Sequence, residues 1–420
     1  MRRVVVTGLG VLAPNGRNVD DFLDSLQTGK SGIRYLEKLK ELKFRCHVAG
    51  IPEMDESVLK HFFSDAAFQN IVSLSIKYGC IATQEALLDA NLPINPEETD
   101  WDMGCVYGHC IGDFLAMKEM ITHVDAGRCR NMGSKFTSQA MNSGPAAMLT
   151  QLFGPGSRVI TNSSACSTGT ESILMAYELI KSGKALRMIA GSAESANEYT
   201  WGGFDSMRVL SAKYNDQPEQ ATRPLSASSC GFAPGSGAAT LILEELESAQ
   251  ARGAKIYCEI KGGDYNSGGQ RNGGSMTAPN VEGVQRCIKN TLDDANIKPQ
   301  DIDLISGHLT ATFADKIEVN NWVSALGLGQ SDFPHINSMK SMTGHCVGAA
   351  GSIESVGAIL QMQHSFIHPS LNCEDLNPEI ADMIDPECIP HHRIDKALNT
   401  VISANFGFGD VNSCIVFQKI

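Results

Sequence analysis

Cys166 stands in a run of small residues, 161–169, between a predicted strand and a predicted helix. Residues 158–160 end the strand, and residues 171–181 carry apolar side chains at helical spacing. A thiol at the start of a helix faces the positive end of the helix dipole, which favours the thiolate. Small neighbours would let a substrate approach the sulfur. An isolated cysteine is more often a buried structural residue, but this setting predicts a nucleophile.

Two histidines also follow predicted strands, in the second half of the chain. His308 lies in the run 307–312, and His345 ends a run that begins at Lys340. A single histidine at a strand end is usually a hydrogen-bonded structural residue. Two of them, each beside a Thr/Gly turn and in one chain with a cysteine at a turn, indicate a nucleophile with paired imidazoles. His109 and Cys110 lack further ligands at coordinating spacing, so no metal site is predicted.

The composition excludes several classes of protein. The chain has 420 residues, of which 42% are hydrophobic and 19% charged, as in a globular protein with a large core. Its formal charge of −13 and the absence of a Lys/Arg block argue against nucleic-acid binding. Thirteen scattered cysteines without a C-x-x-C pair fit a reducing compartment. No signal peptide and no membrane span are predicted, so we expect a cytoplasmic protein.

Strands and helices alternate along the chain, which predicts an α/β fold with largely parallel sheets covered on both faces. Helices are expected over 20–26, 66–90, 171–181 and 244–255, and strands over 3–7, 104–108, 158–160, 187–190, 238–243, 256–262, 303–305, 336–337, 400–402 and 414–417. We place a boundary near residue 250, between halves 1–250 and 251–420. The runs 169–173 and 351–356 each open a helix after a potentially reactive residue, which hints at an internal duplication.

The motifs together resemble one family along essentially the whole chain. The run 340–345 with the small residues 348–351, taken in order with 165–167 and His308, is similar to elongating β-ketoacyl-acyl-carrier-protein synthases, within the thiolase superfamily. The resemblance implies a thiolase-like duplicated fold of five α-β-α-β-α layers, and a dimer. In this superfamily, priming synthases carry the catalytic set Cys-His-Asn and thiolases carry Cys-His-Cys. Because this chain has a histidine, His345, at the third position, it resembles the elongating synthases, whose set is Cys-His-His.

The resemblance assigns a role to each reactive side chain. Cys166 would take the growing acyl chain as a thioester. His308 and His345 would hydrogen-bond the malonyl thioester carbonyl, drive loss of its carboxylate and stabilise the enolate that attacks the acyl-cysteine. Lys340 and Glu318 would hold the histidines and tune their charge. The implied reaction is a decarboxylative Claisen condensation, and the implied enzyme class is acyltransferase.

Further positions follow from the same resemblance. The backbone N–H groups of Cys166 and Phe408 would form an oxyanion hole, and Phe408 would gate the acyl pocket. Thr310 and Thr312 would bind substrate, and the acyl pocket would be lined by Ile111 and Phe204.

The partner implied by the resemblance is an acyl carrier protein. It would supply 4'-phosphopantetheine, so the chain itself is expected to bind no cofactor and no metal. Arg208 is a candidate contact for the carrier. The dimer could be a homodimer or a heterodimer with a related subunit.

The chain departs from the usual family pattern at several places. Leu309 replaces a glycine and is expected to add bulk beside the reacting centre, and Asp410 replaces the last glycine of the usual Gly-Phe-Gly-Gly loop. The segments 226–236 and 266–275 also differ. We therefore expect a specialised substrate in fatty-acid-like, polyketide or polyene biosynthesis.

Two alternative functions remain open at this point. The chain could be a non-catalytic partner that shapes the pocket of a ketosynthase heterodimer, or a ketosynthase-derived acyltransferase that loads Cys166 without decarboxylation. Chain-length-type partners usually lack the nucleophile, so the retained Cys166 argues against the first. The two histidines argue against the second.

Overall fold

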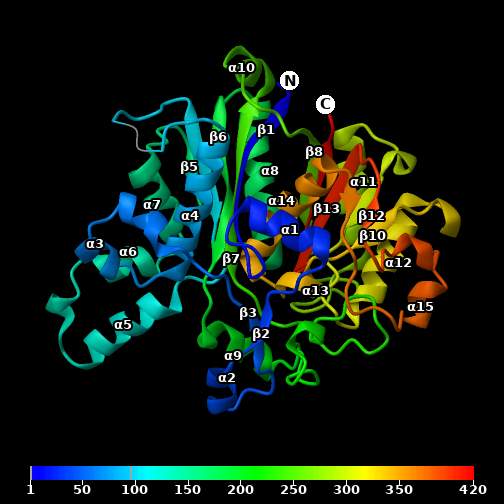
Figure 1. The fold of residues 1–420 in the computed structure, drawn as a ribbon, viewed down its shortest axis with the longest axis horizontal. Coiled ribbons are helices and arrows are strands. Elements are labelled where there is room, and N and C mark those ends of the chain that lie inside the picture. Colours follow the sequence, from blue (N-terminus) through cyan, green and yellow to red (C-terminus); the bar gives the residue numbers. More distant parts are fainter. Residues whose placement is uncertain (1, 95–96) are drawn as a thin grey trace.

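Ten strands form one continuous sheet in the computed structural model, which describes residues 2–94 and 97–420 (Figure 1). Their order is β10-β9-β13-β14-β8-β1-β7-β6-β4-β5. The first half of the chain supplies β1 (Val4–Leu12), β4 (Met103–Gly108), β5 (Val159–Ile160), β6 (Arg187–Glu194) and β7 (Gly237–Glu245). The second half supplies β8 (Cys258–Ser267), β9 (Leu304–Ser306), β10 (His335–Asn337), β13 (Thr400–Gly407) and β14 (Val411–Gln418).

Two small antiparallel pairs lie outside this sheet: β2 (Ile33–Tyr35) with β3 (Val48–Gly50), and β11 (Phe366–Ile367) with β12 (Ile394–Asp395). The helices are α1 (Val19–Thr28), α2 (Glu37–Glu41), α3 (Asp65–Gln69), α4 (Leu74–Asp89), α5 (Phe114–Asp125), α6 (Lys135–Ala140), α7 (Gly144–Phe153), α8 (Thr168–Lys181), α9 (Glu198–Ser206), α10 (Leu246–Ala251), α11 (Val281–Ala295), α12 (Ala314–Leu326), α13 (Lys340–Thr343), α14 (Ala350–Gln363) and α15 (Pro378–Ala381). None of the helices in the described ranges is long and apolar enough to cross a membrane.

The sheet is mixed, so the prediction of largely parallel sheets is wrong. β4 runs parallel to β5 and β6, and β9 runs parallel to β10 and β13. The pairs of β7 with β1 and β6, and of β14 with β8 and β13, are antiparallel. For β13 and β14 the reason is local, because the three residues that join them can only connect antiparallel strands.

The same strand order occurs in both halves: β5-β4-β6-β7-β1 matches β10-β9-β13-β14-β8. The halves join where residues Val4–Val6 of β1 pair with Cys258–Ile260 of β8. Helices α8 and α14 pack on each other and on strands of both halves, while α4 and α7 cover one outer face and α11 and α12 the other. This arrangement gives the five layers of the thiolase fold. Residue 250 lies in α10, between β7 and β8.

Alternation along the strands explains the layers, because successive side chains point to opposite faces of a sheet. In β4, Val106 packs in the central core with α8 and α14, whereas Cys105 and Tyr107 pack in the outer core with α4. In β13, Val401 packs centrally and Ile402 packs in the other outer core. The central helices are therefore buried on nearly every side, and the residues that precede them lie at the centre of the molecule.

Two predicted helices differ from the observed ones. The helix expected over 66–90 is interrupted: α3 ends at Gln69 and α4 begins after Ser73, whose hydroxyl accepts a hydrogen bond from the backbone N–H of Ile76 and caps the helix. The helix expected over 244–255 is only α10, because β7 continues to Glu245. Glu244 is buried there against Thr7 and Arg252, which keeps this position in the strand.

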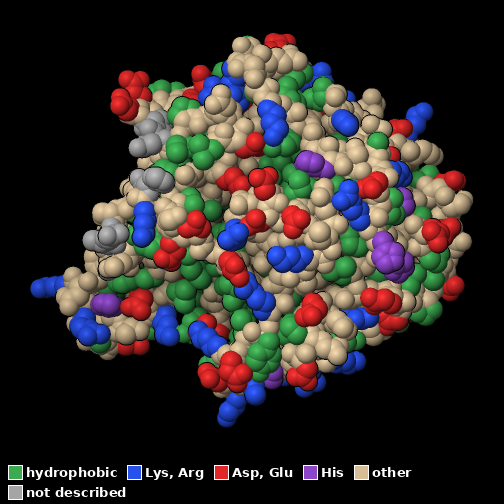
Figure 2. Space-filling view, viewed as in Figure 1, with side chains coloured by type: hydrophobic (Ala, Val, Ile, Leu, Met, Phe, Trp, Pro, Cys, Tyr) green, Lys and Arg blue, Asp and Glu red, His purple; other side chains and the backbone are tan. Residues whose placement is uncertain are grey.

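The surface carries both signs of charge. On the face drawn in Figure 2, Lys and Arg side chains are interspersed with Asp and Glu side chains. All thirteen cysteines have free thiols.

Candidate active site

Cys166 lies at the turn that enters α8, as the sequence predicts. It sits in a single turn of 3-10 helix, Ala165–Ser167, and its side chain is 8% exposed. Ala165 has a φ of 47°, a strained value for a residue with a side chain. The Ser167 hydroxyl donates to the backbone carbonyl of Asn405 at 2.9 Å. This turn is thus fixed against the end of β13, in the other half of the molecule.

His345 lies within hydrogen-bond distance of the thiol. Its Nε2 is 3.1 Å from the Sγ of Cys166, and its Nδ1 accepts the backbone N–H of Val347 at 3.2 Å. Since Nδ1 is an acceptor, the proton of the neutral ring is on Nε2. His345 therefore presents an N–H group to the space beside the sulfur.

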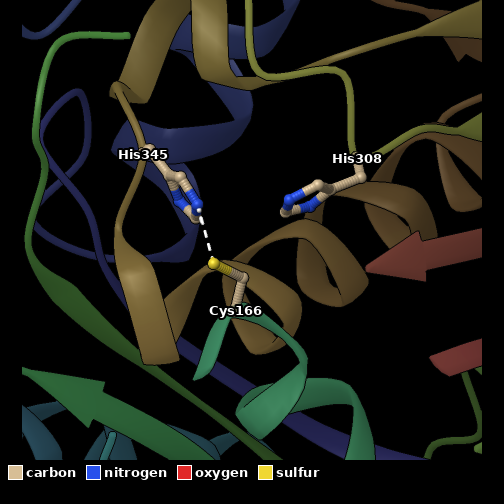
Figure 3. A group of neighbouring side chains, drawn as sticks. All are labelled: Cys166, His308 and His345. Carbon is tan, nitrogen blue, oxygen red and sulfur yellow. Dashed lines mark hydrogen bonds between the residues drawn. The ribbon is translucent and has the colours of Figure 1, made fainter. Parts of the chain in front are cut away.

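His308 approaches the same space from the end of β9 (Figure 3). Its Nδ1 lies 3.3 Å from the Nδ2 of Asn405. An amide nitrogen can only donate, so Nδ1 accepts and the proton of His308 is also on Nε2. The two imidazole rings are 5.4 Å apart and nearly perpendicular. Both histidines thus offer an N–H donor beside one buried sulfur.

Burial sets the charge of both histidines. Desolvation lowers the pKa of His308 and of His345 well below the usual value near 6.5, and the charge of Lys340 lowers both further. Both rings are neutral at pH 7.

Burial also raises the pKa of the Cys166 thiol to about 11. The charge of Lys340 and the backbone N–H groups of Phe408 and of Cys166 itself oppose this rise. The helix dipole favours the thiolate, but it does not decide the ionisation of this cysteine, because desolvation of the anion is the largest effect.

Lys340 reaches His308 through two residues that the sequence did not single out as catalytic. Its buried Nζ pairs with Oε1 of Glu354 on α14 at 2.5 Å. The other oxygen of Glu354 accepts the Nδ2 of Asn405 at 2.7 Å, and the same Nδ2 contacts His308. Thr170 donates to the Oδ1 of Asn405 at 2.6 Å, which fixes the orientation of this amide. The charged lysine thus orients His308 through Glu354 and Asn405.

Glu318 holds the backbone of His308 rather than its ring. Its carboxylate accepts the backbone N–H groups of His308 at 2.8 Å and Leu309 at 2.7 Å. Burial raises the pKa of Glu318 to about 7. The expectation that Leu309 adds bulk beside the reacting centre is wrong, because its side chain packs in the outer core with Trp322. Its φ of 22° shows that the backbone here takes the positive values that favour glycine.

Phe408 lies at the tip of the turn between β13 and β14, and its backbone N–H faces the Cys166 sulfur. The backbone donors predicted for the oxyanion hole are therefore both directed at the thiol. The ring of Phe408 contacts Phe204 edge to face, Phe204 contacts Phe232, and Phe232 contacts His345, with centroid distances of 6.2, 5.9 and 4.9 Å. An aromatic wall joins the tip of this turn to the second histidine.

A cavity of about 620 Å³ leads to Cys166, His308 and His345. The predicted site residues that line it are Phe204, Arg208, Thr310, Thr312, Glu318 and Phe408. The hydroxyls of Thr310 and Thr312 lie 3.0 Å apart. Ile111 is not among the residues that line it. The preceding residue, Cys110, nevertheless lies against the cysteine run, since its backbone carbonyl accepts the Ser163 hydroxyl at 2.7 Å.

The ligand atoms of Cys166, His308 and His345 lie within 4.8 Å of one another, close enough to surround a metal ion. A metal needs an imidazole lone pair, however, and the contacts at both Nδ1 atoms place protons on the Nε2 atoms that face the sulfur. The geometry fits hydrogen-bond donation better than metal binding.

Two protein-family models match the chain. The model for the N-terminal domain of β-ketoacyl synthases matches residues 1–249, and the model for the C-terminal domain matches residues 257–374. The chain belongs to the β-ketoacyl synthase family. Among its relatives, 3-oxoacyl-(acyl-carrier-protein) synthase 1 of Escherichia coli (strain K12) is 34% identical, and the alignment covers all of both chains.

Solved β-ketoacyl synthase structures share the fold. One from Burkholderia phymatum STM815 superposes with a TM-score of 0.91 at 29% identity, covering all of both chains. The AntDE:AntF complex, a type II polyketide synthase acyl carrier protein with its ketosynthase bound to the hexaketide, contains a chain with a TM-score of 0.87 at 29% identity, again covering all of both chains.

Two features of the sequence could have identified Glu354 and Asn405 as candidate site residues. Glu354 is the one charged residue in the apolar run 350–363, and a buried charge without a function is rare. Asn405 closely follows the predicted core strand 400–402, at the edge where the other site residues lie.

Proposed function

We propose that this β-ketoacyl synthase catalyses the decarboxylative Claisen condensation of an acyl group held on Cys166 with malonyl-acyl-carrier protein. The observation that carries the proposal is the convergence of two neutral imidazole N–H donors, from His308 and His345, beside one buried thiol.

The first step loads the cysteine. The Cys166 sulfur attacks the thioester carbonyl of an acyl group on the carrier's 4'-phosphopantetheine. The C–S bond to the carrier breaks, and the released carrier thiol takes the proton. The oxyanion of the tetrahedral intermediate is held by the backbone N–H groups of Cys166 and Phe408. One such donor contributes roughly 100- to 1,000-fold to the rate in other enzymes.

The second step forms the new carbon–carbon bond. His308 and His345 donate hydrogen bonds to the thioester carbonyl of the malonyl group. Its carboxylate leaves as carbon dioxide, and the electron pair of the broken bond forms an enolate. The enolate carbon attacks the acyl carbonyl on Cys166 and expels the thiolate, which leaves a β-ketoacyl group on the carrier. Neutral donors suit this step because the negative charge develops on the oxygen that they contact.

The pH dependence of malonyl decarboxylation tests the state of the histidines. A neutral imidazole becomes protonated only when the pH falls through its own pKa, which burial and Lys340 lower for both rings. We expect the rate of malonyl-carrier consumption to stay level from pH 8 through 6.5. Because burial raises the pKa of Glu318 to about 7, the measurement is repeated with Glu318→Gln, and a midpoint near 6.5 in that variant would mean that the rings are not held neutral.

The carrier is proposed to dock at the mouth of the cavity. Arg208 is exposed at the mouth of the cavity, where it could meet an acidic carrier protein. The Arg208→Glu variant should raise the KM for acyl-carrier about tenfold with kcat nearly unchanged, because a rim charge acts on association. Steady-state kinetics with the carrier measure this, and an unchanged KM would remove Arg208 from the interface. Thr310 and Thr312 are our candidates to hold the phosphopantetheine arm.

We also propose a dimer, formed by two copies or with a related subunit. β5 is the last strand of the sheet and leaves one edge unpaired, with Val159 42% exposed. Ile121 and Val124 of α5 are 60% and 51% exposed. Sedimentation of the purified protein tests this. The free thiols fit a reducing, cytoplasmic location.

The two alternative functions make different predictions in one assay. Acyl-carrier and malonyl-carrier are mixed with the protein, and the products on the carrier are identified by mass spectrometry. Condensation gives a β-ketoacyl group and carbon dioxide. An acyltransferase would load Cys166 and leave malonyl-carrier intact, and a pocket-shaping partner would do neither. The observed triad favours condensation; the pathway, whether fatty-acid-like, polyketide or polyene, follows from the preferred acyl chain.

A further inference from the structure

The turn that carries Phe408 is fixed by a buried carboxylate two residues further on. Asp410 is 1% exposed, with a φ of 64°. Its Oδ1 accepts the backbone N–H of Asn280 at 2.8 Å, and its Oδ2 accepts that of Gln270 at 2.9 Å. Among the ion pairs of residues 2–94 and 97–420, none involves Asp410, and its carboxyl group is held by these backbone N–H groups.

The segment 268–280 is shaped to receive this carboxylate. A Cβ on Gly268 would lie 2.3 Å from Oδ2 of Asp410, and one on Gly274 would lie 2.7 Å from it. The backbone N–H of Gly268 also donates to the carbonyl of Asp410 at 2.9 Å, and that of Gly409 donates to the carbonyl of Met276 at 2.9 Å. Two positions at which this chain departs from its family, Asp410 and the segment 266–275, therefore contact each other.

The other side of the turn is fixed to the cysteine. Gly407 packs on the backbone of Cys166, where a Cβ would lie 3.0 Å from its nitrogen. The Ser167 hydroxyl bonds the backbone carbonyls of Asn405 and Val411, at either side of the turn. Phe408 thus lies between an anchor on the cysteine and an anchor on the segment 268–280.

We propose that Asp410 is a positioning residue for the acyl-transfer step: by binding Gln270 and Asn280, it holds the backbone N–H of Phe408 at the place where the oxyanion forms. This inference rests on the proposed function. Asp410 does not touch the reacting atoms. It acts through the three-residue turn, whose residues Gly409 and Asp410 both have positive φ.

The test compares two reactions of one sulfur in the full-length protein. Acylation by an acyl-N-acetylcysteamine thioester forms an oxyanion, since the thiolate adds to the carbonyl before the cysteamine thiol leaves. Alkylation by iodoacetamide displaces iodide and forms none. Both are followed at Cys166 by peptide mass spectrometry. Dividing the acylation rate by the alkylation rate cancels changes in access to the thiol and in its ionisation, because both reactions use the same sulfur.

For Asp410→Gly, we expect this ratio to fall at least about tenfold, because displacement of an oxyanion donor slows only acylation. Glycine adopts the positive φ of this position, so the variant should fold. Asp410→Asn keeps one acceptor oxygen and should give an intermediate ratio. As a matched control, Asp303 caps the other end of β13 by accepting the N–H groups of Asn399 and Thr400, and Asp303→Asn should leave the ratio unchanged.

A ratio for Asp410→Gly equal to that of the unmodified protein would overturn the proposal, as would an equal fall in the Asp303→Asn control. If the protein without substitutions is alkylated at Cys166 but never acylated, the proposed function itself has failed. These outcomes are distinguishable because alkylation reports the thiol in every variant.

Discussion

The Cys166→Ala variant should form no acyl-enzyme and should lose condensation by at least about a thousandfold, the largest effect that we expect from any single change. The thiol is the one nucleophile held 3.1 Å from an imidazole in this cavity, within the part of the chain that the structure describes. Removing a catalytic nucleophile from other enzymes has effects of this size or larger. Alanine replaces a buried side chain by a smaller one of similar polarity, so the fold should persist.

The same variant should still consume malonyl-carrier. His308 and His345 keep their donors when the thiol is removed, since His308 is oriented by Asn405 and His345 by the N–H of Val347. Carbon dioxide release without a β-ketoacyl product is therefore the expected signature, measured by mass spectrometry of the carrier. Cys230 also lines the cavity, and Cys230→Ala is the matched control, expected to retain condensation. Product formation by Cys166→Ala at a substantial fraction of the original rate would show that another group carries the acyl chain.

His308→Ala and His345→Ala should have the opposite pattern. Each removes one of the two N–H donors to the developing enolate, so we expect decarboxylation to fall by about 100- to 1,000-fold. Acylation of Cys166 uses the backbone donors of Cys166 and Phe408 and should be reduced far less. Intact-mass measurements of acyl-enzyme and assays of malonyl-carrier consumption, made on the same samples, separate the two effects.

The exposed His364 provides the control for these variants, because His364→Ala removes an imidazole that lies outside the cavity. Equal losses of acylation and decarboxylation in His308→Ala would contradict the division of roles. They would mean that the imidazole acts on the thiol rather than on the malonyl carbonyl.

The parts of the site that follow from local sequence could be predicted. Cys166, His308 and His345 each come at the end of a strand or at the start of a central helix, and the layered fold places those ends together. Because these residues match the motif of a known family, the reaction could be predicted as well. The backbone donors of Cys166 and Phe408 followed from the same motifs.

Other features depend on contacts between distant segments and could not be predicted from spacing. Glu354 meets Lys340 and Asn405 only because α13, α14 and β13 converge in the central layer. Ile111 does not line the cavity, although the carbonyl of its neighbour Cys110 accepts the Ser163 hydroxyl, and its role in holding the acyl chain stays a prediction.

The net ionisation of Cys166 could not be predicted from the helix dipole, for a related reason. A sequence shows the helix that begins after the thiol, and hence its dipole, but it does not show how completely the fold will remove water from the sulfur. In the structure, desolvation outweighs both the N–H groups and the charge of Lys340. The thiol is therefore protonated at rest. Attack on an acyl group then requires that the proton leave as the bond forms.

The intact mass of the protein during one turnover shows whether Cys166 carries the acyl chain through condensation. Acyl-carrier is added first and malonyl-carrier second, and the masses of the protein and of the carrier are followed together. We expect a mass gain equal to one acyl group at Cys166, then its loss upon addition of malonyl-carrier, with a β-ketoacyl group two carbons longer appearing on the carrier. An acyl group that stays on Cys166 while malonyl-carrier remains intact, or no mass gain with any acyl chain, would contradict this expectation.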